Sequence, residues 1–523
     1  MLRLNLILVL VLASAGWAQA QQSTTAGQST TLGQGQSGTQ SGNSQQGTAP
    51  NPSGMGQPPA QTPGTSTTTG TTSTGRQIGG PVPTTRGTGN VLGAQNVPGA
   101  AVVTQGPASL SLEQAIQLAI KNNLATLLAH ERRREAEGLK QEARAPLLPN
   151  ISGTAYQANV TQNLAALGFQ PSTFPGIRST FIGPFNNFDA RARLVQTIFD
   201  LSAIKNYQAG RAGVRVAEVE EALAREQVAS GTALTYLEAL RADRSVAAAQ
   251  ANVELAQTLL KLAQDQRNAG VATGVDVTRA QTRLAEEQLR LAQAQMASEQ
   301  ARLNLQRVVG LSFESPLILT DQLRYMDEPV PSAETAVAQA AQSRPEIRIA
   351  EEQIRVNELE RQAVRAEHLP SLEFVGDYGV SGITPTNTDL PTRRAAIQLN
   401  VPVFNGGLTR GREAVAASRA RQAELELGSV RGQVEEDVRL ALSAVRTAMA
   451  QVRAADESVT LAERELEMAR DRFRAGVADN LEVINAQTAL ANARDAQVTA
   501  LAVYNAARLN LAAALGRAEA FRW

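Results

Sequence analysis

The stretch "RAGVADNLEVINAQ", Arg474 to Gln487, has a near-copy earlier in the chain, "NAGVATGVDVTRAQ", Asn268 to Gln281. Gly476 aligns with Gly270 at an offset of 206 positions (476 − 270), and several neighbouring residues recur at the same offset. Glycine suits the left-handed position that ends a helix. The letters "TGVD" and "DNLE", which follow the two glycines, are typical of capping boxes that begin a new helix. Each stretch is therefore predicted to be a bend between an outgoing helix and a returning one.

Long helices are predicted on both sides of each bend. The outgoing segments, Leu201 to Asn268 and Leu408 to Arg474, are rich in Ala, Glu, Gln, Arg and Leu and contain no proline. At about 1.5 Å per residue, each would reach roughly 100 Å. Shorter return helices are predicted for Val275 to Val309 and for Leu481 to Leu515. The sequence thus predicts two helical hairpins, 201–309 and 408–515.

Each hairpin follows a pair of short helices and a pair of extended segments. "SLEQAI" from Ser111 matches "SAETAV" from Ser332 at an offset of 221 (332 − 111), and a proline ends the second short helix of each copy. Alternating apolar residues then predict strands. The predicted strands are Ile151 to about Leu164, Asn186 to Phe199, Ser371 to about Gly382 and Thr392 to Phe404. The first linking loop carries Pro171, Pro175 and Pro184, and the second carries Pro385 and Pro391. The fold class is therefore α+β with two tandem repeats, 106–325 and 326–516, and a short tail at 517–523.

The N-terminal region has a different character. Residues 1–20 combine one arginine, a short apolar core and the cleavage motif Ala18-Gln19-Ala20, which predicts a secretory signal peptide. Residues 21–105 are mostly Gln, Ser, Thr, Gly and Pro and are predicted to be a disordered arm. The letters "GQGQSG", Gly33 to Gly38, match a nucleotide-binding fingerprint, but neither a predicted strand nor a predicted helix flanks them, so the match is compositional.

Composition limits the classes of function. The 49 Lys and Arg residues balance the 49 Asp and Glu residues, so the chain has no net positive charge that would indicate nucleic-acid binding. The chain contains no cysteine, so an exported form has no disulfides. The two histidines, His130 and His368, lie outside the usual metal and nucleophile motifs and are interpreted as surface or junction residues. We therefore expect no enzyme activity, no metal site and no cofactor.

Strands and long helices together suggest a membrane channel. Eight of the 11 Phe lie in the strand-and-loop zones between Ile151 and Phe404, as in a membrane barrel with interfacial aromatics, although alternation alone favours a soluble antiparallel sheet. Beyond the signal no apolar run approaches a transmembrane helix, so any crossing would use strands. Four strands cannot close a barrel, and open edges cannot persist in lipid. The hypothesis is that several chains pool their strands. The alternative is a soluble periplasmic coiled-coil adaptor or scaffold protein, which explains export and hairpins but not the aromatic strand pairs.

The order and doubled spacing of these pieces resemble the TolC-like outer membrane efflux proteins, also called outer membrane factors, over roughly Leu110 to Gly516. The pieces that carry the resemblance are "VPVFNGG" (Val401 to Gly407), "RFRAGVADNLEVINAQTALANAR" (Arg472 to Arg494), "NAGVATGVDVTRAQTRL" from Asn268 and "LPSLEFVGDYG" (Leu369 to Gly379). The resemblance implies a homotrimer with one 12-stranded β-barrel in the outer membrane, four strands from each chain, continuous with a long periplasmic α-helical barrel. It implies a passive exit duct of a tripartite efflux pump or type I secretion system. The implied partners are outer membrane lipid, a periplasmic adaptor (membrane fusion) protein and an inner-membrane transporter, which supplies the energy.

The resemblance also assigns roles to individual residues. The acidic constriction of the family falls on Glu482 and Asn485, so only the first carboxylate is present. Asp276 matches an acid of the closed-state latch, but its basic and tyrosine partners fall on Ala478 and Phe473. Simple capping explains Asp276 and Glu482 as well, because an acid at the third helical position accepts a backbone proton. The implied adaptor-docking tips are Gly270, Val271, Ala272, Gly476, Val477 and Ala478, and the implied strand-to-helix exits are Phe199, Asp200, Phe404, Asn405, Gly406 and Gly407.

Overall fold

A computed structural model describes residues 98–104, 109–167, 180–475, 477 and 480–522 of the chain. All of them belong to one compact unit, Gly75–Trp523. The predicted signal peptide, the glycine motif at Gly33 to Gly38 and most of the predicted arm lie outside the described residues. The last predicted arm residues are paired: the amide of Thr104 donates to Gly310 at 2.8 Å, and Ala100 donates to Arg307 at 2.9 Å. The described part of the chain therefore begins at Pro98, within the range predicted for the arm.

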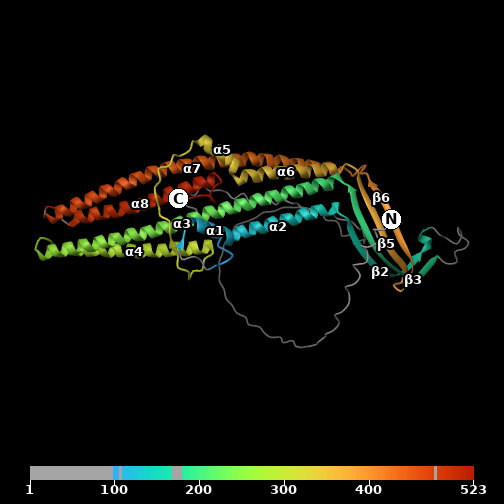
Figure 1. The fold of residues 1–523 in the computed structure, drawn as a ribbon, viewed down its shortest axis with the longest axis horizontal. Helices are drawn as coiled ribbons and strands as arrows, with labels where there is room; N and C mark the ends of the chain where they lie inside the picture. The colour runs from blue at the N-terminus through green and yellow to red at the C-terminus, as the bar shows by residue number, and fades with distance from the viewer. Residues whose placement is uncertain (1–97, 105–108, 168–179, 476, 478–479, 523) are drawn as a thin grey trace, which may run out of the picture. The chain divides into compact units, whose positions relative to one another are not determined.

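Eight α-helices account for most of the described chain (Figure 1). The two longest helices, of 68 and 67 residues, have the bounds predicted from the sequence. The helices are α1 (Leu112–Asn122), α2 (Leu124–Arg144), α3 (Leu201–Asn268), α4 (Gly274–Val309), α5 (Ala333–Ser343), α6 (Pro345–Ala366), α7 (Leu408–Arg474) and α8 (Asn480–Ala514). Two 3-10 helices, η2 (Ala145–Leu147) and η3 (Leu164–Leu167), flank the first strand of the large sheet. Within the described ranges, no helix has the length and apolar content needed to cross a membrane.

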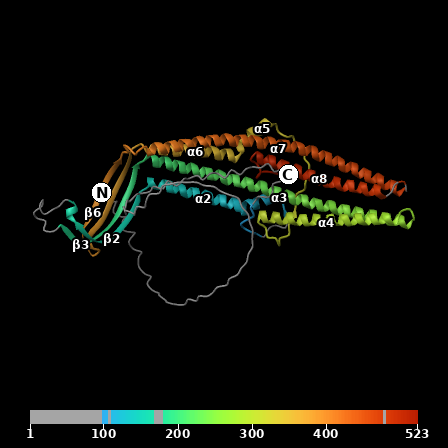
Figure 2. The ribbon, with the colours of Figure 1, turned by 180° about the vertical axis from the view of Figure 1, so that it is seen from behind.

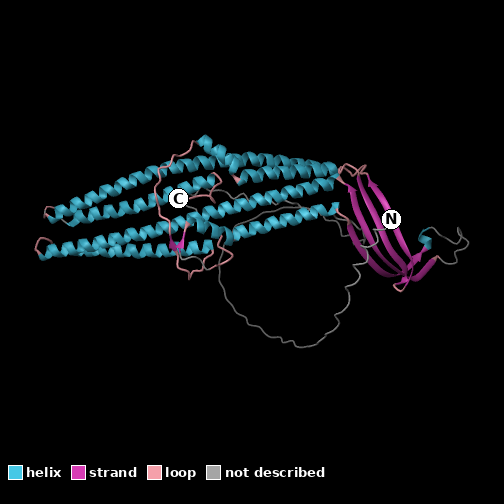
Figure 3. Cartoon of the chain, in the orientation of Figure 1, coloured by secondary structure: helices cyan, strands magenta, loops and turns pink. Residues whose placement is uncertain are grey.

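The large sheet has four antiparallel strands in the order β2 (Asn150–Asn163), β3 (Phe181–Phe199), β5 (Ser371–Thr384) and β6 (Asn387–Asn400) (Figure 3). A separate small sheet pairs β1 (Ser109–Leu110) with β4 (Ile318–Leu319) in parallel. The order of elements from α1 to α4 occurs again from α5 to α8: two helices, two strands of the large sheet and a long hairpin.

The bounds of β3 and β6 differ most from the predictions. Strand β3 begins at Phe181 rather than Asn186 and includes Pro184, which the sequence placed in a loop. Proline is tolerated there because this end of β3 pairs with β2 only, and its pairing with β5 begins at Phe188. Strand β6 begins at Asn387 rather than Thr392, and so includes Pro391, which the prediction placed in the second linking loop. It ends at Asn400 rather than Phe404. Pro402 has no amide proton for the ladder, so the segment 401–405 leaves the sheet before α7 starts.

Packing between helices defines a layer with two lateral borders. Helices α2 and α4 pack on α3, which packs on α6 and α8, and these in turn pack on α7. The lateral order is therefore α2 and α4, then α3, then α6 and α8, then α7, which Figure 2 shows from behind. The strands of the large sheet run across the layer in the same lateral order as the helices, because β2 follows α2 in the chain and β6 precedes α7. One border consists of β2, α2 and α4, and the other of β6 and α7.

The buried core is divided into small clusters along the helices. The largest joins α1, α3, α4 and α8 with the C-terminal tail, where Phe521 is buried. Tyr236 in this cluster donates its hydroxyl proton to the Leu110 carbonyl at 2.9 Å, and the tail is held by an ion pair of 2.7 Å between Arg522 and Glu113. A second cluster near the hairpin ends joins α3, α7 and α8 through Leu259, Phe473 and Val483. Alanine dominates these contacts, so the helices pack closely without a wide apolar stripe.

Candidate functional site

The large sheet has one polar and one apolar face. Residues that pair across antiparallel strands share a face, and successive residues alternate. One row of paired residues is Arg193, Asp377 and Arg394, and the next row along the strands contains Arg191. The opposite face carries apolar residues that include Ile151, Leu194, Leu372, Phe374, Tyr378, Ile397 and Leu399, with Gln157, Asn159, Gln196 and Arg393 as exceptions. Most of this apolar face is uncovered, since Ile397 and Leu399 are 68% and 63% exposed.

An ion-pair network organises the polar face. The Arg191 Nε donates to Asp189 Oδ1 at 2.6 Å, and its guanidinium reaches Asp377 at 3.6 Å. Ser381 donates its hydroxyl proton to the other Asp189 oxygen at 2.9 Å. Gly379 lies opposite Arg191 in the register, and a Cβ at Gly379 would come within 2.5 Å of the Arg191 Cβ. Glycine therefore leaves the space that the arginine occupies.

Both outer edges of the sheet are open within the described residues. Strand β2 pairs only with β3, and β6 pairs only with β5. Such edges present unpaired backbone N–H and C=O groups that readily pair with another strand. The sheet therefore lacks the closure that a membrane environment requires of a β-structure.

The strand-to-helix exits differ between the two halves. In the first, Phe199 ends β3 and the Asp200 carboxylate accepts the amide proton of Ala203, which caps α3. In the second, Gly406 and Gly407 have φ values of 65° and 84°, and α7 starts directly after them. The Asn405 amide donates to the Thr409 hydroxyl at this turn, and the neighbouring Phe404 is 89% exposed.

The hairpin bends have the predicted helix-ending geometry where they are described. Gly270 has a φ of 78°, and Val271 beside it is 73% exposed. Ala272 follows at the same bend, and Val477 in the second bend is 72% exposed. Gly476 and Ala478 lie outside the described residues. Two bends with exposed valines are therefore available to a partner.

Asp276 forms the capping box that the sequence predicts. Its carboxylate accepts the Thr273 hydroxyl proton at 2.6 Å and the Thr273 amide proton at 2.9 Å. The hydroxyl bond from Thr273 is the main cause that holds the pKa of Asp276 below its ordinary value. Arg279 adds a longer ion pair of 3.8 Å. Capping thus accounts for the position of this carboxylate.

Glu482 has a basic partner that the sequence analysis missed. Arg472, at the end of α7, contacts Glu482 of α8 with an N–O distance of 3.3 Å across the second bend. Asn485 is exposed one turn further along α8. The sequence analysis considered partner positions for Asp276 only, at Ala478 and Phe473, and named none for Glu482. The partner comes from ten residues earlier (482 − 472), a separation that helical spacing does not connect.

Two side-chain amides join the two hairpins near the bends. Asn480 Nδ2 donates to the backbone oxygen of Asp276 at 2.9 Å. Gln266 Nε2 donates to the backbone oxygen of Phe473 at 3.2 Å. We call this pair of bonds the amide clasp. Asn480 is buried, so its donor would lose a partner if the hairpins separated. Nothing in the sequence distinguishes these two amides from the many other Asn and Gln residues.

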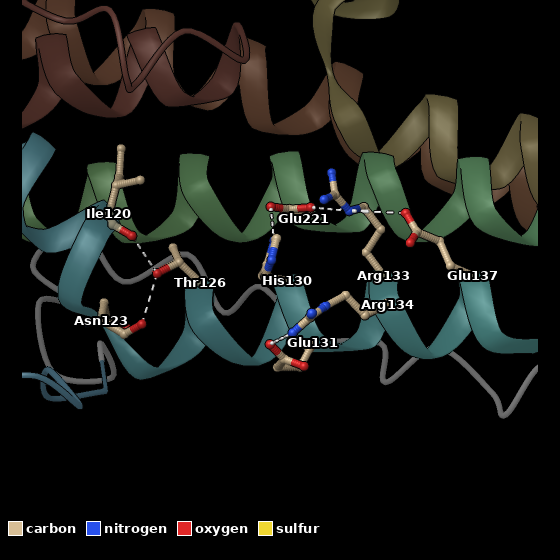
Figure 4. Close-up of polar contacts among 9 residues, drawn as sticks. All are labelled: Ile120, Asn123, Thr126, His130, Glu131, Arg133, Arg134, Glu137 and Glu221. Atoms are coloured by element: carbon tan, nitrogen blue, oxygen red, sulfur yellow. Dashed lines mark hydrogen bonds and ion pairs between the residues drawn. The ribbon is translucent and has the colours of Figure 1, made fainter. Parts of the chain in front are cut away.

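The two histidines lie in different parts of the fold. His130 Nδ1 lies 3.2 Å from the Glu221 carboxylate, and Arg133 lies 3.3 Å from the same group, which ties α2 to α3 (Figure 4). His368 lies in the turn after α6. Among the described residues, no three His, Asp or Glu side chains gather in a metal-binding arrangement.

Comparison with known families identifies the class. The profile described as "Outer membrane efflux protein" matches residues 115–311 and 336–517, which together are more than half of the chain. The chain belongs to the outer membrane efflux protein family. It is an export channel protein of the outer membrane, and the family is one of transport proteins.

Individual relatives agree with this assignment. The pyoverdine export outer membrane protein OpmQ of Pseudomonas putida is 25% identical over 400 residues, covering 75% of this chain and 82% of OpmQ. The alkaline protease secretion protein AprF of Pseudomonas aeruginosa is 25% identical over 398 residues, covering 74% and 80%. The outer membrane protein TolC of Escherichia coli is 23% identical over 395 residues, covering 72% and 76%.

Solved structures share the fold. The CmeC outer membrane channel of Campylobacter jejuni superposes with a TM-score of 0.67 at 20% identity, covering 78% of this chain and 86% of CmeC. The outer membrane protein VceC of Vibrio cholerae gives 0.65 at 17% identity, covering 78% and 96%.

Proposed function

We propose that three copies of the chain form one channel, with a 12-stranded barrel in the outer membrane and a helical tunnel in the periplasm. The observation that carries this proposal is the two-faced sheet with open edges at β2 and β6. Lipid favours the apolar face that carries Ile397 and Leu399, and water favours the face that carries Arg193 and Asp377. Pairing of β2 with β6 of the next copy removes both edges at once.

The repeated order of elements supports an origin of the chain in two tandem repeats, 106–325 and 326–516, followed by a tail at 517–523. Under this proposal, each repeat contributes two strands to the wall and one hairpin to the tunnel. Residues 1–20 are a signal peptide and 21–105 an arm that follows it, as the sequence predicts.

The hairpin ends are the proposed gate. Threefold symmetry would bring three copies of Glu482 together, with Asn485 and Asp276 on the neighbouring turns of the constriction. Close carboxylates repel one another and attract cations. The ion pair with Arg472 partly neutralises the negative charge of Glu482, and the amide clasp keeps the two hairpins of one copy together.

The exposed bends are the proposed docking points for a periplasmic adaptor bound to an inner-membrane transporter. The residues proposed for this contact are Gly270, Val271, Ala272, Gly476, Val477 and Ala478. Two apolar valines at solvent-exposed bends favour a protein partner over free solvent. The named relatives include a pyoverdine export protein and an alkaline protease secretion protein, so both an efflux pump and a type I secretion system are candidates for the system it serves.

The decisive test combines location, mass and conduction. The channel is expected to stay with outer membranes after a carbonate wash, to have a trimeric mass in mild detergent, and to conduct ions in planar bilayers. The soluble scaffold alternative predicts release by the wash. A monomer without conduction would overturn the proposal.

A further inference from the structure

Two arginines on the polar face of the large sheet have no ion-pair partner among the described residues. Arg193 of β3 and Arg394 of β6 lie in one row of paired residues, with Asp377 of β5 between them. Both arginines are exposed, and within the described ranges neither forms a hydrogen bond or an ion pair through its guanidinium. Their donors are therefore directed to solvent on the face that the proposed channel turns toward its lumen.

The nearby carboxylates are already bound by a third arginine. Arg191 donates to Asp189 at 2.6 Å and reaches Asp377 at 3.6 Å. Asp189 also accepts the hydroxyl proton of Ser381. The three consecutive rows that contain these residues hold three arginines and two aspartates, which leaves a net charge of +1 per chain (3 − 2). The excess positive charge belongs to the row of Arg193 and Arg394.

A neighbouring copy would not neutralise this charge. In the proposed barrel, β6 of one copy pairs with β2 of the next. Strand β2 (Asn150–Asn163) contains no aspartate and no glutamate. Whatever register the two strands adopt, β2 therefore supplies no carboxylate to Arg394. Within one chain, β2 places Ser152 beside Arg193, which is also uncharged.

The strand order spaces the two arginines evenly. In the order β2, β3, β5, β6, Arg193 lies on the second strand and Arg394 on the fourth. Joining β6 to β2 of the next copy continues this alternation, so an arginine recurs on every second strand. Neighbouring strands are about 4.8 Å apart, which separates successive arginines by roughly 10 Å around the wall. Because barrel strands tilt, the arginines of three copies form an inclined series rather than a flat ring.

An open hollow beside Arg193 gives an independent observation. It has a volume of about 680 Å³ and lies where α2 and η2 meet the sheet. Its polar lining consists of Glu142, Asn150, Ser152, Arg193 and Thr197. Glu142 forms no ion pair with Arg193, although both residues are described. The Asn150 amide and the Ser152 hydroxyl can donate hydrogen bonds, so a negatively charged group on Arg193 would find further donors there.

These observations favour an anion as the ligand. The planar guanidinium of arginine matches the geometry of carboxylate and phosphate groups, and rings of arginine line pores that pass anions. We propose that Arg193 and Arg394 of the three copies form an anion-binding belt on the inner wall of the barrel, which retains solutes that carry carboxylate or phosphate groups. This inference rests on the proposed channel and adds the chemical class of solute that its barrel favours.

A cysteine reporter beside the belt tests this proposal, because the chain contains no other cysteine. Ser152→Cys differs little from serine in size and lies next to Arg193 in the same row. The full-length reporter channel, in outer membranes, is treated with an anionic or a cationic methanethiosulfonate reagent of similar size. The ratio of the anionic to the cationic reaction rate measures the local potential. Adding Arg193→Gln with Arg394→Gln is expected to lower this ratio about fivefold or more at an ionic strength of about 0.01 M.

Inorganic phosphate is the binding probe. Phosphate should slow the anionic reagent at Ser152→Cys more than chloride does at the same ionic strength, because chloride screens the charge without matching the guanidinium forks. This difference should disappear in the double variant Arg193→Gln with Arg394→Gln. Arg193→Lys with Arg394→Lys keeps both charges and should restore the rate ratio.

The matched control is Arg393→Gln. Arg393 is the residue next to Arg394 in β6, but it lies on the opposite face of the sheet, so removal of its charge should leave the ratio unchanged. Glu482→Gln is the second control. Glu482 lies beyond the far end of α7, roughly 100 Å from the sheet, which is well outside the range of an exposed charge.

The outcomes separate the belt from the channel. A conducting trimer in which Arg193→Gln with Arg394→Gln leaves the rate ratio unchanged overturns the belt and keeps the channel. An equal fall in Arg393→Gln shows that the arginines do not face the lumen and also overturns the belt. Protection by phosphate that is no stronger than that by chloride, or no rescue by the lysine variant, overturns anion binding. A monomer without conduction overturns the proposed channel and the belt together.

Discussion

The Asn480 side-chain amide donates to the backbone oxygen of Asp276 at 2.9 Å, and so joins α8 of the second hairpin to α4 of the first. With the bond from Gln266 to Phe473, it forms the amide clasp. Both bonds link neutral groups, so salt screening weakens them far less than an ion pair. The hairpins of one chain are therefore held together by contacts that do not titrate.

Removing the clasp is expected to favour separated hairpins. Each hydrogen bond contributes about 0.5–1.5 kcal/mol, so Gln266→Ala with Asn480→Ala shifts the balance by roughly 1–3 kcal/mol in each chain. Single-channel recording would then show a higher open probability. Asn492→Ala, at an exposed position on the same helix, is the control and should behave like the unaltered protein. Equal open probabilities for the double variant and the control would show that the clasp plays no part in closure.

Glu482→Gln is expected to lower the cation preference of the channel. The substitution removes one carboxylate per chain from the proposed constriction and leaves its shape nearly unchanged. Reversal potentials in a salt gradient measure the preference. Because Arg472 lies 3.3 Å from Glu482, Arg472→Gln should act in the opposite direction and raise the cation preference. If neither variant moves the reversal potential, the constriction lies elsewhere.

Val477→Asp is expected to weaken adaptor binding. The change places a charge on an exposed apolar residue at the second bend, where burial in an interface would cost desolvation. Cross-linking to the adaptor in cells should fall several-fold, while the amount of channel in the outer membrane stays the same. Gln451→Asp, exposed on α7 well away from the bend, serves as the control. Normal cross-linking of Val477→Asp would remove this bend from the docking surface.

The Thr273–Asp276 capping box is expected to make the start of α4 sensitive to acid. Thr273 keeps the pKa of Asp276 below its ordinary value of 3.8, so the stabilisation is complete above that pH and is lost as the pH falls through the lower folded value. Thr273→Ala should cost about 0.5–2 kcal/mol at neutral pH. Faster tryptic cleavage after Arg279 would report the loosened first turn at neutral pH. In the unaltered protein, amide-exchange protection of this turn should decline only below about pH 4; protection that declines between pH 5 and 7 would contradict this assignment.

The sequence predicted the regular elements well and the tertiary contacts poorly. The long helices could be predicted because Leu201 to Asn268 lacks proline and ends at a glycine bend, both of which are local signals. The sequence placed Pro184 in a loop, but the structure includes it in β3. Whether a strand tolerates a proline depends on its neighbours, and β5 does not pair with β3 at this position. The Arg472–Glu482 ion pair and the amide clasp depend on how two hairpins lie together, which no single-segment pattern encodes.

Gly379→Ala is expected to destabilise the sheet, whereas Gly153→Ala is not. A Cβ at Gly379 would lie 2.5 Å from the Ala190 backbone oxygen and 2.5 Å from the Arg191 Cβ, so β3 and β5 must separate or Arg191 must leave its ion pairs. Overpacking of this kind costs about 1–3 kcal/mol. A Cβ at Gly153 of β2 would meet no atom within 4 Å. Thermal unfolding of the detergent-purified assembly should show a lower midpoint for Gly379→Ala only. Equal midpoints for the two variants would mean that Arg191 does not need the space above Gly379.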